Sequence, residues 1–166
     1  AGEVIQALRE KFQDRLIIGA GTVLDSETAR HAILHNAQFI IAPNFSQEVA
    51  VMCNRYQIPY APGCTTLTEA LQALEAGAAF IKAFPISDFY GPRLVSVFKT
   101  PIPYMPILAS GGIDLKNLKD YVLRGVDCCG FGSLLTKGSR EEIAANARSI
   151  RTLIDEARQE MQTTAG

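Results

Sequence analysis

The chain has 166 residues, of which 48% are hydrophobic and 20% charged, a balance typical of a globular protein with a sizeable core. Sixteen basic residues against seventeen acidic ones leave a formal net charge of −1, which argues against nucleic-acid binding because that needs a basic excess. No apolar run reaches the roughly 18 residues of a membrane-spanning helix, and no signal peptide opens the chain. We therefore expect neither a nucleic acid nor a membrane among its partners.

A predicted strand followed by a loop and a helix recurs at intervals of roughly 20 to 27 residues, the length of a βα unit. Short apolar runs without clean alternation are typical of strands that are buried on both faces of a parallel sheet. Most of these runs end in glycine, proline or serine, where the chain is expected to turn. The predicted strands cover residues 15–19, 38–42, 58–61, 79–84, 105–109 and 127–131.

Helical patterns fill the intervals between these strands. Apolar residues on one face predict a first helix over residues 4–12. Thr66-x-x-Glu69 and Ser139-x-x-Glu142 are capping boxes, which predict that helices begin directly after Thr66 and Ser139.

Lys82 is the first candidate for chemistry. It lies in an otherwise apolar strand, and the period of two places Phe80 and Phe84 on the same face. Burial between aromatic rings disfavours the charged amine and lowers its pKa. A neutral amine can attack a carbonyl carbon and form a Schiff base. The alternative is a lysine near the end of a strand whose amine reaches solvent, but a lysine is rarely buried without a role.

Two glycine-rich loops follow the last two predicted strands. The first lies between a strand and a helix that Asp114 could cap, and the second follows the next strand. Glycine backbones can approach an anion closely, and paired loops in these positions hold phosphate in (β/α)₈ barrels. Either loop alone could be a tight turn, but together they favour a phosphate site. The candidate phosphate-binding residues are Ser110, Gly111, Gly112, Gly132 and Ser133.

Other polar positions are less specific. Thr22, Pro43 and Thr65 follow predicted strands and could line a ligand pocket. His31 and His35 have the i, i+4 spacing of a zinc site, but no third ligand is apparent and an exposed helix face is favoured. The four cysteines lie in apolar or strand-like surroundings. We expect them to be buried, reduced thiols of an intracellular, cytoplasmic protein.

Four motifs now resemble a known family when taken together. They are Gly19-Ala-Gly-Thr-Val-Leu24, Pro62-Gly-Cys-Thr-Thr66, Phe80-Ile-Lys-Ala-Phe-Pro85 and Ser110-Gly-Gly-Ile113. In this order and spacing they resemble the 2-keto-3-deoxy-6-phosphogluconate aldolases, a family that includes 4-hydroxy-2-oxoglutarate aldolases. The resemblance covers nearly the whole chain. It implies a class I aldolase on a (β/α)₈ TIM barrel, a homotrimer, and no metal or other cofactor.

The resemblance also implies roles for single positions. Lys82 matches the Schiff-base lysine, and Phe84 matches the aromatic residue beside it. Ala83 and Ile86 replace residues that are more usual around this lysine, so the choice of substrate stays open. The positions that match the pocket around the pyruvate part are Thr22, Pro43, Gly63 and Thr65, and those that match the phosphate cradle are Ser110, where the family often has threonine, Gly111, Gly112 and Ser133.

The number of strands bears on the extent of the barrel. Six predicted strands in this chain fall short of the eight in a barrel of roughly 200 residues or more. If the glycine-rich loops follow strands seven and eight, Lys82 lies on strand six. We therefore expect one N-terminally incomplete barrel domain over residues 1–166, with strands 3–8 present and the first two missing. By resemblance, the family's proton-transfer glutamate and a substrate-binding arginine would precede the first helix.

The implied function is cleavage of a 2-keto-3-deoxy-6-phospho sugar acid, or of 4-hydroxy-2-oxoglutarate, to pyruvate and an aldehyde such as glyceraldehyde 3-phosphate. Two alternatives stay open. A thiamine-phosphate-synthase-like transferase would keep the phosphate loops but would need metal-binding acids, for which Asp25 and Asp88 are the near candidates. A truncated relative without catalytic activity would bind a phosphorylated ligand or serve as a subunit.

Overall fold

The computed structural model describes residues 1–85 and 87–164, without the side chains of residues 87, 88 and 164. The chain divides into two compact units, Ala1–Lys82 and Ala83–Gly166. Each unit is described by itself below, and the expected single domain over residues 1–166 stays a prediction.

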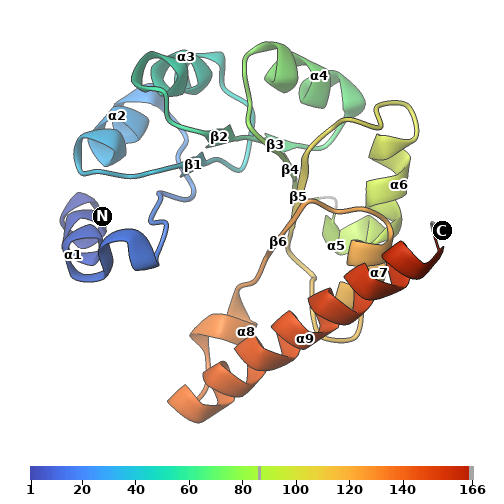
Figure 1. Cartoon of the computed structure of the whole chain (residues 1–166). Coiled ribbons are helices and arrows are strands. Elements are labelled where there is room, and N and C mark those ends of the chain that lie inside the picture. Colours follow the sequence, from blue (N-terminus) through green and yellow to red (C-terminus); the bar gives the residue numbers. More distant parts are fainter. Residues whose placement is uncertain (86, 165–166) are drawn as a thin grey trace. The chain divides into compact units, whose positions relative to one another are not determined.

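The first unit alternates helices with very short strands (Figure 1). Its elements are α1 (Gly2–Phe12), the 3₁₀ turn η1 (Gln13–Arg15), α2 (Ser26–Leu34), β1 (Ile40–Ile41), α3 (Gln47–Tyr56), β2 (Tyr60–Ala61), β3 (Gly63–Cys64), α4 (Leu67–Glu75) and β4 (Ile81–Ala83).

The strands of the first unit pair in parallel, as expected for βα units. Ile40 of β1 lies opposite Tyr60 of β2, and Ala20 forms a parallel bridge with Ile40 on its other side. Farther along, the backbone N–H of Lys82 donates to the carbonyl of Pro62 at 2.9 Å, and β4 lies beside β3. Because the strands run in the same direction, their carboxyl ends meet at one edge.

The core of this unit lies between the strands and helices α2 and α3. Ile40 and Val49 are fully buried, and Tyr60 is 2% exposed. Burial raises the pKa of Tyr60 to about 12. Its hydroxyl still has partners: it accepts from the backbone N–H of Ser46 and donates to the carbonyl of Asn44, both at 3.3 Å. This buried hydroxyl therefore fixes the loop that leaves β1.

Two strand predictions need correction. Residues 15–19 do not form a regular strand: Arg15 ends the η1 turn, Leu16 and Ile17 are 46% and 74% exposed, and Ala20 makes an isolated bridge. A strand needs neighbours to satisfy its backbone, and among the described residues this segment pairs on the β1 side alone. Conversely, β3 (Gly63–Cys64) was expected to be a turn, because Pro62-Gly63 has the composition of one.

The second unit contains α5 (Ser87–Tyr90), α6 (Arg93–Lys99), β5 (Ile107–Ser110), α7 (Leu118–Leu123), β6 (Cys128–Gly130), α8 (Ser133–Thr136) and α9 (Arg140–Thr164). Strands β5 and β6 pair in parallel, with Ser110 opposite Gly130 at their carboxyl ends. Helix α9 packs along α7 (Figure 1). Ile150 and Ala157 of α9 are buried, and an ion pair of 2.8 Å joins Lys119 to Glu160.

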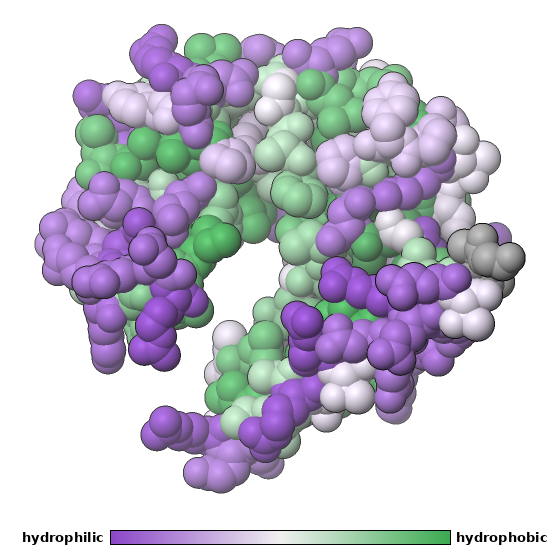
Figure 2. All heavy atoms as spheres, in the orientation of Figure 1, coloured by the Kyte–Doolittle hydropathy of each residue, from purple (hydrophilic) through white to green (hydrophobic). Residues whose placement is uncertain are grey.

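Polar contacts also link α6, β5 and β6 of this unit. The carboxylate oxygen Oδ2 of Asp127 accepts from the backbone N–H of Ile107 at 2.8 Å and lies 2.8 Å from Nζ of Lys99. One side chain thus joins the end of α6 to the starts of β5 and β6. The visible surface of α9 is largely hydrophilic (Figure 2). In the described part of the chain, no helix combines the length and the apolar content needed to cross a membrane.

Helix α4 begins in the predicted capping box. The hydroxyl of Thr66 accepts from the backbone N–H of Glu69 at 3.2 Å, and Oε2 of Glu69 accepts from the backbone N–H groups of Thr65 and Thr66, both at 2.8 Å. These hydrogen bonds lower the pKa of Glu69, with the largest effect from the backbone N–H of Thr65 and the next from that of Thr66. The box prediction is confirmed. The helix ends at Glu75, and Gly77, directly after the helix cap, has φ +87°.

We expect Glu69→Ala to lower the free energy of unfolding by about 1 kcal/mol at pH 7, because two backbone donors lose their acceptor. A lowered carboxyl pKa gives stability that is present above the ordinary value of 4.5 and is lost as the pH falls through the folded-state pKa. The deficit of the variant should therefore narrow at pH 3. Urea unfolding at both pH values measures it, with Glu75→Ala on the same helix as the control. An equal deficit at pH 7 and pH 3 would contradict this account.

Candidate active site

The carboxyl ends of the strands in the first unit collect four of the candidate residues. Thr22 lies two residues after the Ala20 bridge, Pro43 two residues after β1, and Gly63 two residues after β2. Lys82 lies within β4 itself. Because the strands are parallel, all four positions belong to the same edge, where ligands of α/β proteins bind.

Gly63 and Pro43 are in direct contact. Gly63 is buried, and a Cβ placed on it would overlap the carbonyl group of Pro43 and lie 2.9 Å from the backbone nitrogen of Asn44. No side chain can be accommodated at this distance from a backbone. Glycine at position 63 therefore lets the turns after β1 and β2 meet at the site.

Thr22 has an unusual backbone conformation. Its φ of +59° lies in the left-handed region, which β-branched residues rarely adopt. The next residue holds the chain in place, since Val23 is 1% exposed and its backbone N–H donates to the carbonyl of Ile41 at 3.2 Å. Strain of this kind is retained where the surroundings impose it, commonly at functional sites.

Lys82 occupies a partly desolvated position in β4. Its neighbours Ile81 and Ala83 are buried, while Lys82 and the two flanking phenylalanines, Phe80 and Phe84, are half-buried. The predicted alternation along this strand is therefore confirmed. Burial lowers the pKa of Lys82 below the ordinary lysine value of 10.5. Desolvation thus increases the fraction of neutral, nucleophilic amine.

Thr65 follows β3 and is exposed at the start of the turn into α4. The carboxylate of Glu69 holds its backbone N–H, as described above. Glu69 itself is kept ionised by its lowered pKa, so it acts as a fixed acceptor for the turn. The position of Thr65 beside the strand ends thus depends on the same capping box that begins α4.

The glycine-rich loops lie in the second unit. The register of Ser110 with Gly130 places the exits of both loops at the same edge of the β5–β6 pair. Gly130 leaves room for the neighbouring side chain, since a Cβ there would lie 3.3 Å from Oγ of Ser110. Gly111 and Gly112 have φ of +92° and +64°, so two successive residues adopt the conformation that glycine allows.

Helix α7 begins later than the sequence indicates. Asp114 was expected to cap it, but the N-cap is Asn117 and the helix starts at Leu118. Oδ1 of Asp114 instead accepts from the backbone N–H groups of Lys116 and Asn117, at 2.8 and 3.0 Å. Asp114 thus organises the turn between the glycines and the helix.

The second loop is simpler. Gly132 and Ser133 are both exposed, and Ser133 opens the short helix α8. The carbonyl of Gly132 accepts from the backbone N–H of Leu135 and from the hydroxyl of Thr136, both at 3.0 Å. The phosphate candidates therefore belong to the second unit, and the pyruvate-side candidates other than Phe84 belong to the first.

The residues that a metal-dependent function would need are Asp25 and Asp88, or His31 and His35 for a zinc site. The carboxylate of Asp25 accepts from the backbone N–H of Thr28 at 2.6 Å, caps α2 and has a lowered pKa for that reason. The side chain of Asp88 lies outside the described residues. The ring centroids of His31 and His35 lie 4.3 Å apart with the rings tilted at 43°, and the described residues contain no cluster of three or more potential metal ligands.

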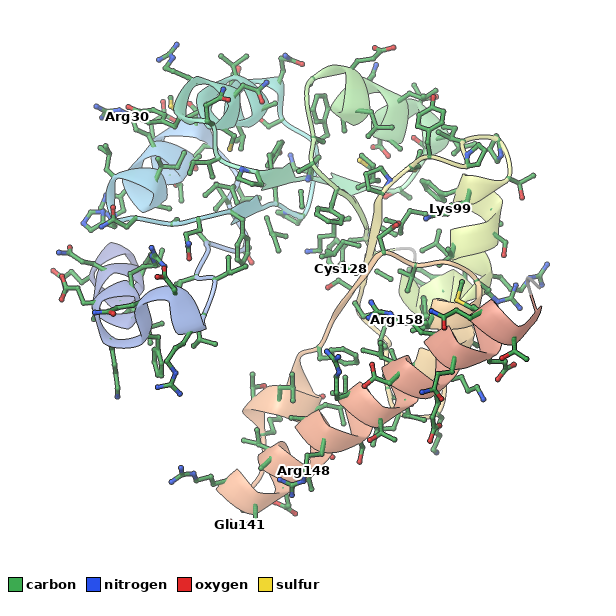
Figure 3. All side chains as sticks on the ribbon, in the orientation of Figure 1. Arg30, Lys99, Cys128, Glu141, Arg148 and Arg158 are labelled. Carbon is green, nitrogen blue, oxygen red and sulfur yellow. The ribbon has the colours of Figure 1, made fainter. Side chains whose placement is uncertain are left out.

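The cysteines divide into two groups. Cys53 and Cys64 are buried as predicted, and burial raises their thiol pKa values to about 11 and about 12. The prediction is wrong for Cys128, which is exposed, and Cys129 is only half-buried. Cys128 belongs to β6. It lines a hollow of about 240 Å³ bordered by α7, β6 and α9, to which Arg158 also contributes (Figure 3).

The family model described as KDPG and KHG aldolase matches residues 1–150. The chain belongs to this family. It is 37% identical, over 74% of its length, to the 2-dehydro-3-deoxy-phosphogluconate aldolase of Treponema pallidum, and 36% identical, over 82%, to the 2-dehydro-3-deoxy-6-phosphogalactonate aldolase of Escherichia coli. It spans 58% and 66% of the lengths of these relatives.

Solved structures of the family also match the chain. A structure of native KDPGal superposes with a TM-score of 0.87 and 36% identity, covering 93% of this chain and 76% of the other. The KDPG aldolase of Legionella pneumophila, with pyruvate captured as a covalent carbinolamine intermediate, gives a TM-score of 0.74 and 28% identity, covering 94% and 73%. The predicted fold class, the α/β barrel of this family, is thereby confirmed.

We expect Gly63→Ala to destabilise the protein by about 1–3 kcal/mol, because the added methyl group forces apart the two turns that meet at Pro43. Gly21→Ala is the matched control, since nothing lies within 4 Å of a Cβ at that position. Thermal unfolding of both variants measures the difference. Equal stability of the two variants would show that the close contact at Gly63 is not required.

Proposed function

We propose that this protein is a class I aldolase in which Lys82 forms a Schiff base with a 2-keto acid. The single observation that carries the proposal is a half-buried lysine of lowered pKa at the carboxyl edge of the parallel strands. Membership of the aldolase family supports it. The covalent carbinolamine of pyruvate in the Legionella relative supports the same type of intermediate.

The chemistry follows from the amine. Nζ of Lys82 attacks C2 of the keto acid, and loss of water leaves an iminium ion, which draws electrons from the neighbouring bonds. A general base accepts the proton of the C4 hydroxyl, the C3–C4 bond breaks, and the electron pair moves into the iminium to give an enamine. The aldehyde leaves. Protonation of the enamine at C3 and addition of water then release pyruvate and the free lysine.

The residues of the first unit suit the pyruvate half of the substrate. Thr22, Pro43, Gly63 and Thr65 lie at or beside the ends of strands, and the side chains of Thr22 and Thr65 are exposed. Phe84, two residues after Lys82, adds a half-buried aromatic surface. We assign these residues to pyruvate binding.

The loops of the second unit suit a distal phosphate. Ser110, Gly111 and Gly112 leave the same strand edge as Gly132 and Ser133, and Gly112, Gly132 and Ser133 are exposed. Binding energy from a phosphate far from the reacting carbon can be used to position that carbon. The proposed substrate is therefore a 2-keto-3-deoxy-6-phospho sugar acid, with 4-hydroxy-2-oxoglutarate as the second candidate. The homotrimer and the cytoplasmic location stay predictions.

We expect borohydride to trap pyruvate on Lys82 as a stable secondary amine, because reduction fixes the imine. Peptide mass mapping should show one reduced pyruvate, on the peptide that contains Lys82. Lys82→Ala should abolish both labelling and aldol cleavage, whereas Lys11→Ala, at an exposed lysine of α1, should leave both unchanged. Labelling at another residue, or cleavage that persists in Lys82→Ala, would rule out the proposed nucleophile.

We expect the amine of Lys82 to become reactive at a lower pH than an ordinary lysine. Burial penalises the ammonium form, so the group loses its proton below the ordinary value of 10.5. Competitive acetylation over a range of pH, with a lysine model peptide in the same tube as reference, gives the titration midpoint by mass spectrometry. A midpoint at or above that of the peptide would show that Lys82 is not desolvated.

A further inference from the structure

Asn117 bridges the loop that follows β5. Its Nδ2 donates to the carbonyl of Gly112 at 2.7 Å, and its Oδ1 accepts from the backbone N–H of Asp114 at 3.0 Å. The carboxylate of Asp114 in turn accepts from the backbone N–H of Asn117 at 3.0 Å. The side chain of Asn117 is half-buried, and it uses both ends of its amide on the segment between the glycines and α7.

These contacts hold one end of the glycine pair. The other end is held by the strand register, which fixes Ser110 opposite Gly130. Between the two anchors lie Gly111 and Gly112, both with positive φ. Glycine has more conformational freedom to lose than any other residue, so an unanchored pair would populate many backbone conformations. The hydrogen bond to the carbonyl of Gly112 selects one of them.

The selected conformation leaves a donor available. Gly112 is exposed, and within the described part of the chain its backbone N–H donates to no other group. Its carbonyl, which would repel an anion, is occupied by Nδ2 of Asn117. The carbonyl of Gly112 therefore accepts from Asn117, and the backbone N–H of Gly112 is left to donate to a ligand.

We propose that Asn117 is a positioning residue for phosphate recognition: it acts through Gly112 and holds the glycine pair in the conformation that binds the phosphate of the substrate. The inference rests on the proposed function, because that function assigns the phosphate to this loop. Asn117 itself contacts the backbone and not the ligand. Preorganisation of this kind raises affinity by removing the ordering cost from the binding step.

The simpler role of Asn117 is to cap α7, since it occupies the N-cap position. Its side chain, however, makes no capping hydrogen bond to that helix and instead reaches back to Gly112. A purely structural role would affect every activity of the protein alike. A positioning role affects ligands that carry phosphate and spares those that do not.

The test compares phosphorylated and unphosphorylated ligands on the full chain. In Asn117→Ala, we expect the KM for 2-keto-3-deoxy-6-phosphogluconate to rise about tenfold with kcat nearly unchanged. The dissociation constant of inorganic phosphate, measured by calorimetry, should rise by a similar factor. The rate at which borohydride traps pyruvate, which carries no phosphate, should stay the same and so report an intact fold.

Two further variants sharpen the test. Asn117→Asp keeps the size and the acceptor for Asp114 but loses the donor to Gly112, so it should also weaken phosphate binding while pyruvate trapping persists. Asn54→Ala is the matched control, because Asn54 makes the same kind of bond, from Nδ2 to the carbonyl of Ala76 at 2.9 Å, in the first unit. It should leave the affinity for phosphate unchanged.

The outcomes separate the two proposals. Equal phosphate affinity in Asn117→Ala and the parent, no phosphate binding by the parent, or a parallel loss of pyruvate trapping in the variant would each overturn the role of Asn117. Failure of the parent to be labelled by pyruvate at Lys82 would instead overturn the Schiff-base proposal. Phosphate calorimetry decides the role of Asn117 in either case.

Discussion

Parallel pairing of very short strands is the constraint on which the site depends. β1 and β2 share two residue pairs, and the Ala20 bridge adds a parallel segment on the other side of β1. Because the strands run the same way, the turns that follow them emerge at one edge. The contact between Gly63 and the carbonyl of Pro43 then sets how closely two of these turns approach. A side chain at Gly63 would therefore displace the turns that carry the candidate residues.

Two physical effects shape the candidate site: desolvation of the Lys82 amine, and hydrogen bonds that fix the backbone of the turns. Burial lowers the pKa of Lys82, and this lowered pKa supports its proposed role as the nucleophile. The turns are fixed differently, by polar side chains that bind backbone groups. Glu69 holds the amides before α4, and Asn117 holds the carbonyl of Gly112 before α7. In both turns a side chain from the following helix or its cap orders the loop that leaves a strand.

Local signals allowed part of this arrangement to be predicted. Thr66 and Glu69 carry a complete capping box in four residues, and the alternation around Lys82 lies within a single strand, so neither depends on distant parts of the chain. The prediction of a strand at 15–19 was wrong: Leu16 and Ile17 are exposed, and the bridge to β1 is made by Ala20, one residue beyond the predicted span. A strand depends on its neighbours, which a local pattern does not reveal.

The backbone conformations and side-chain contacts of the turns could not be predicted from the sequence pattern. The left-handed φ of Thr22 runs against the preference of a β-branched residue, and tertiary contacts through Val23 impose it. Asp114 and Asn117 are both residue types that favour the N-cap of a helix. The residue types alone do not show that Asn117 takes the N-cap position or that its side chain donates to the carbonyl of Gly112. The spacing of a polar amide five residues after a Gly-Gly pair is the signal that was available there.

The most direct test of the central claim is a crystal structure of the protein grown with pyruvate. The account predicts continuous electron density from Nζ of Lys82 to C2 of pyruvate, with the carboxylate of pyruvate against the turns at Thr22 and Gly63. An unmodified Lys82, with pyruvate bound elsewhere or joined to a different lysine, would contradict it.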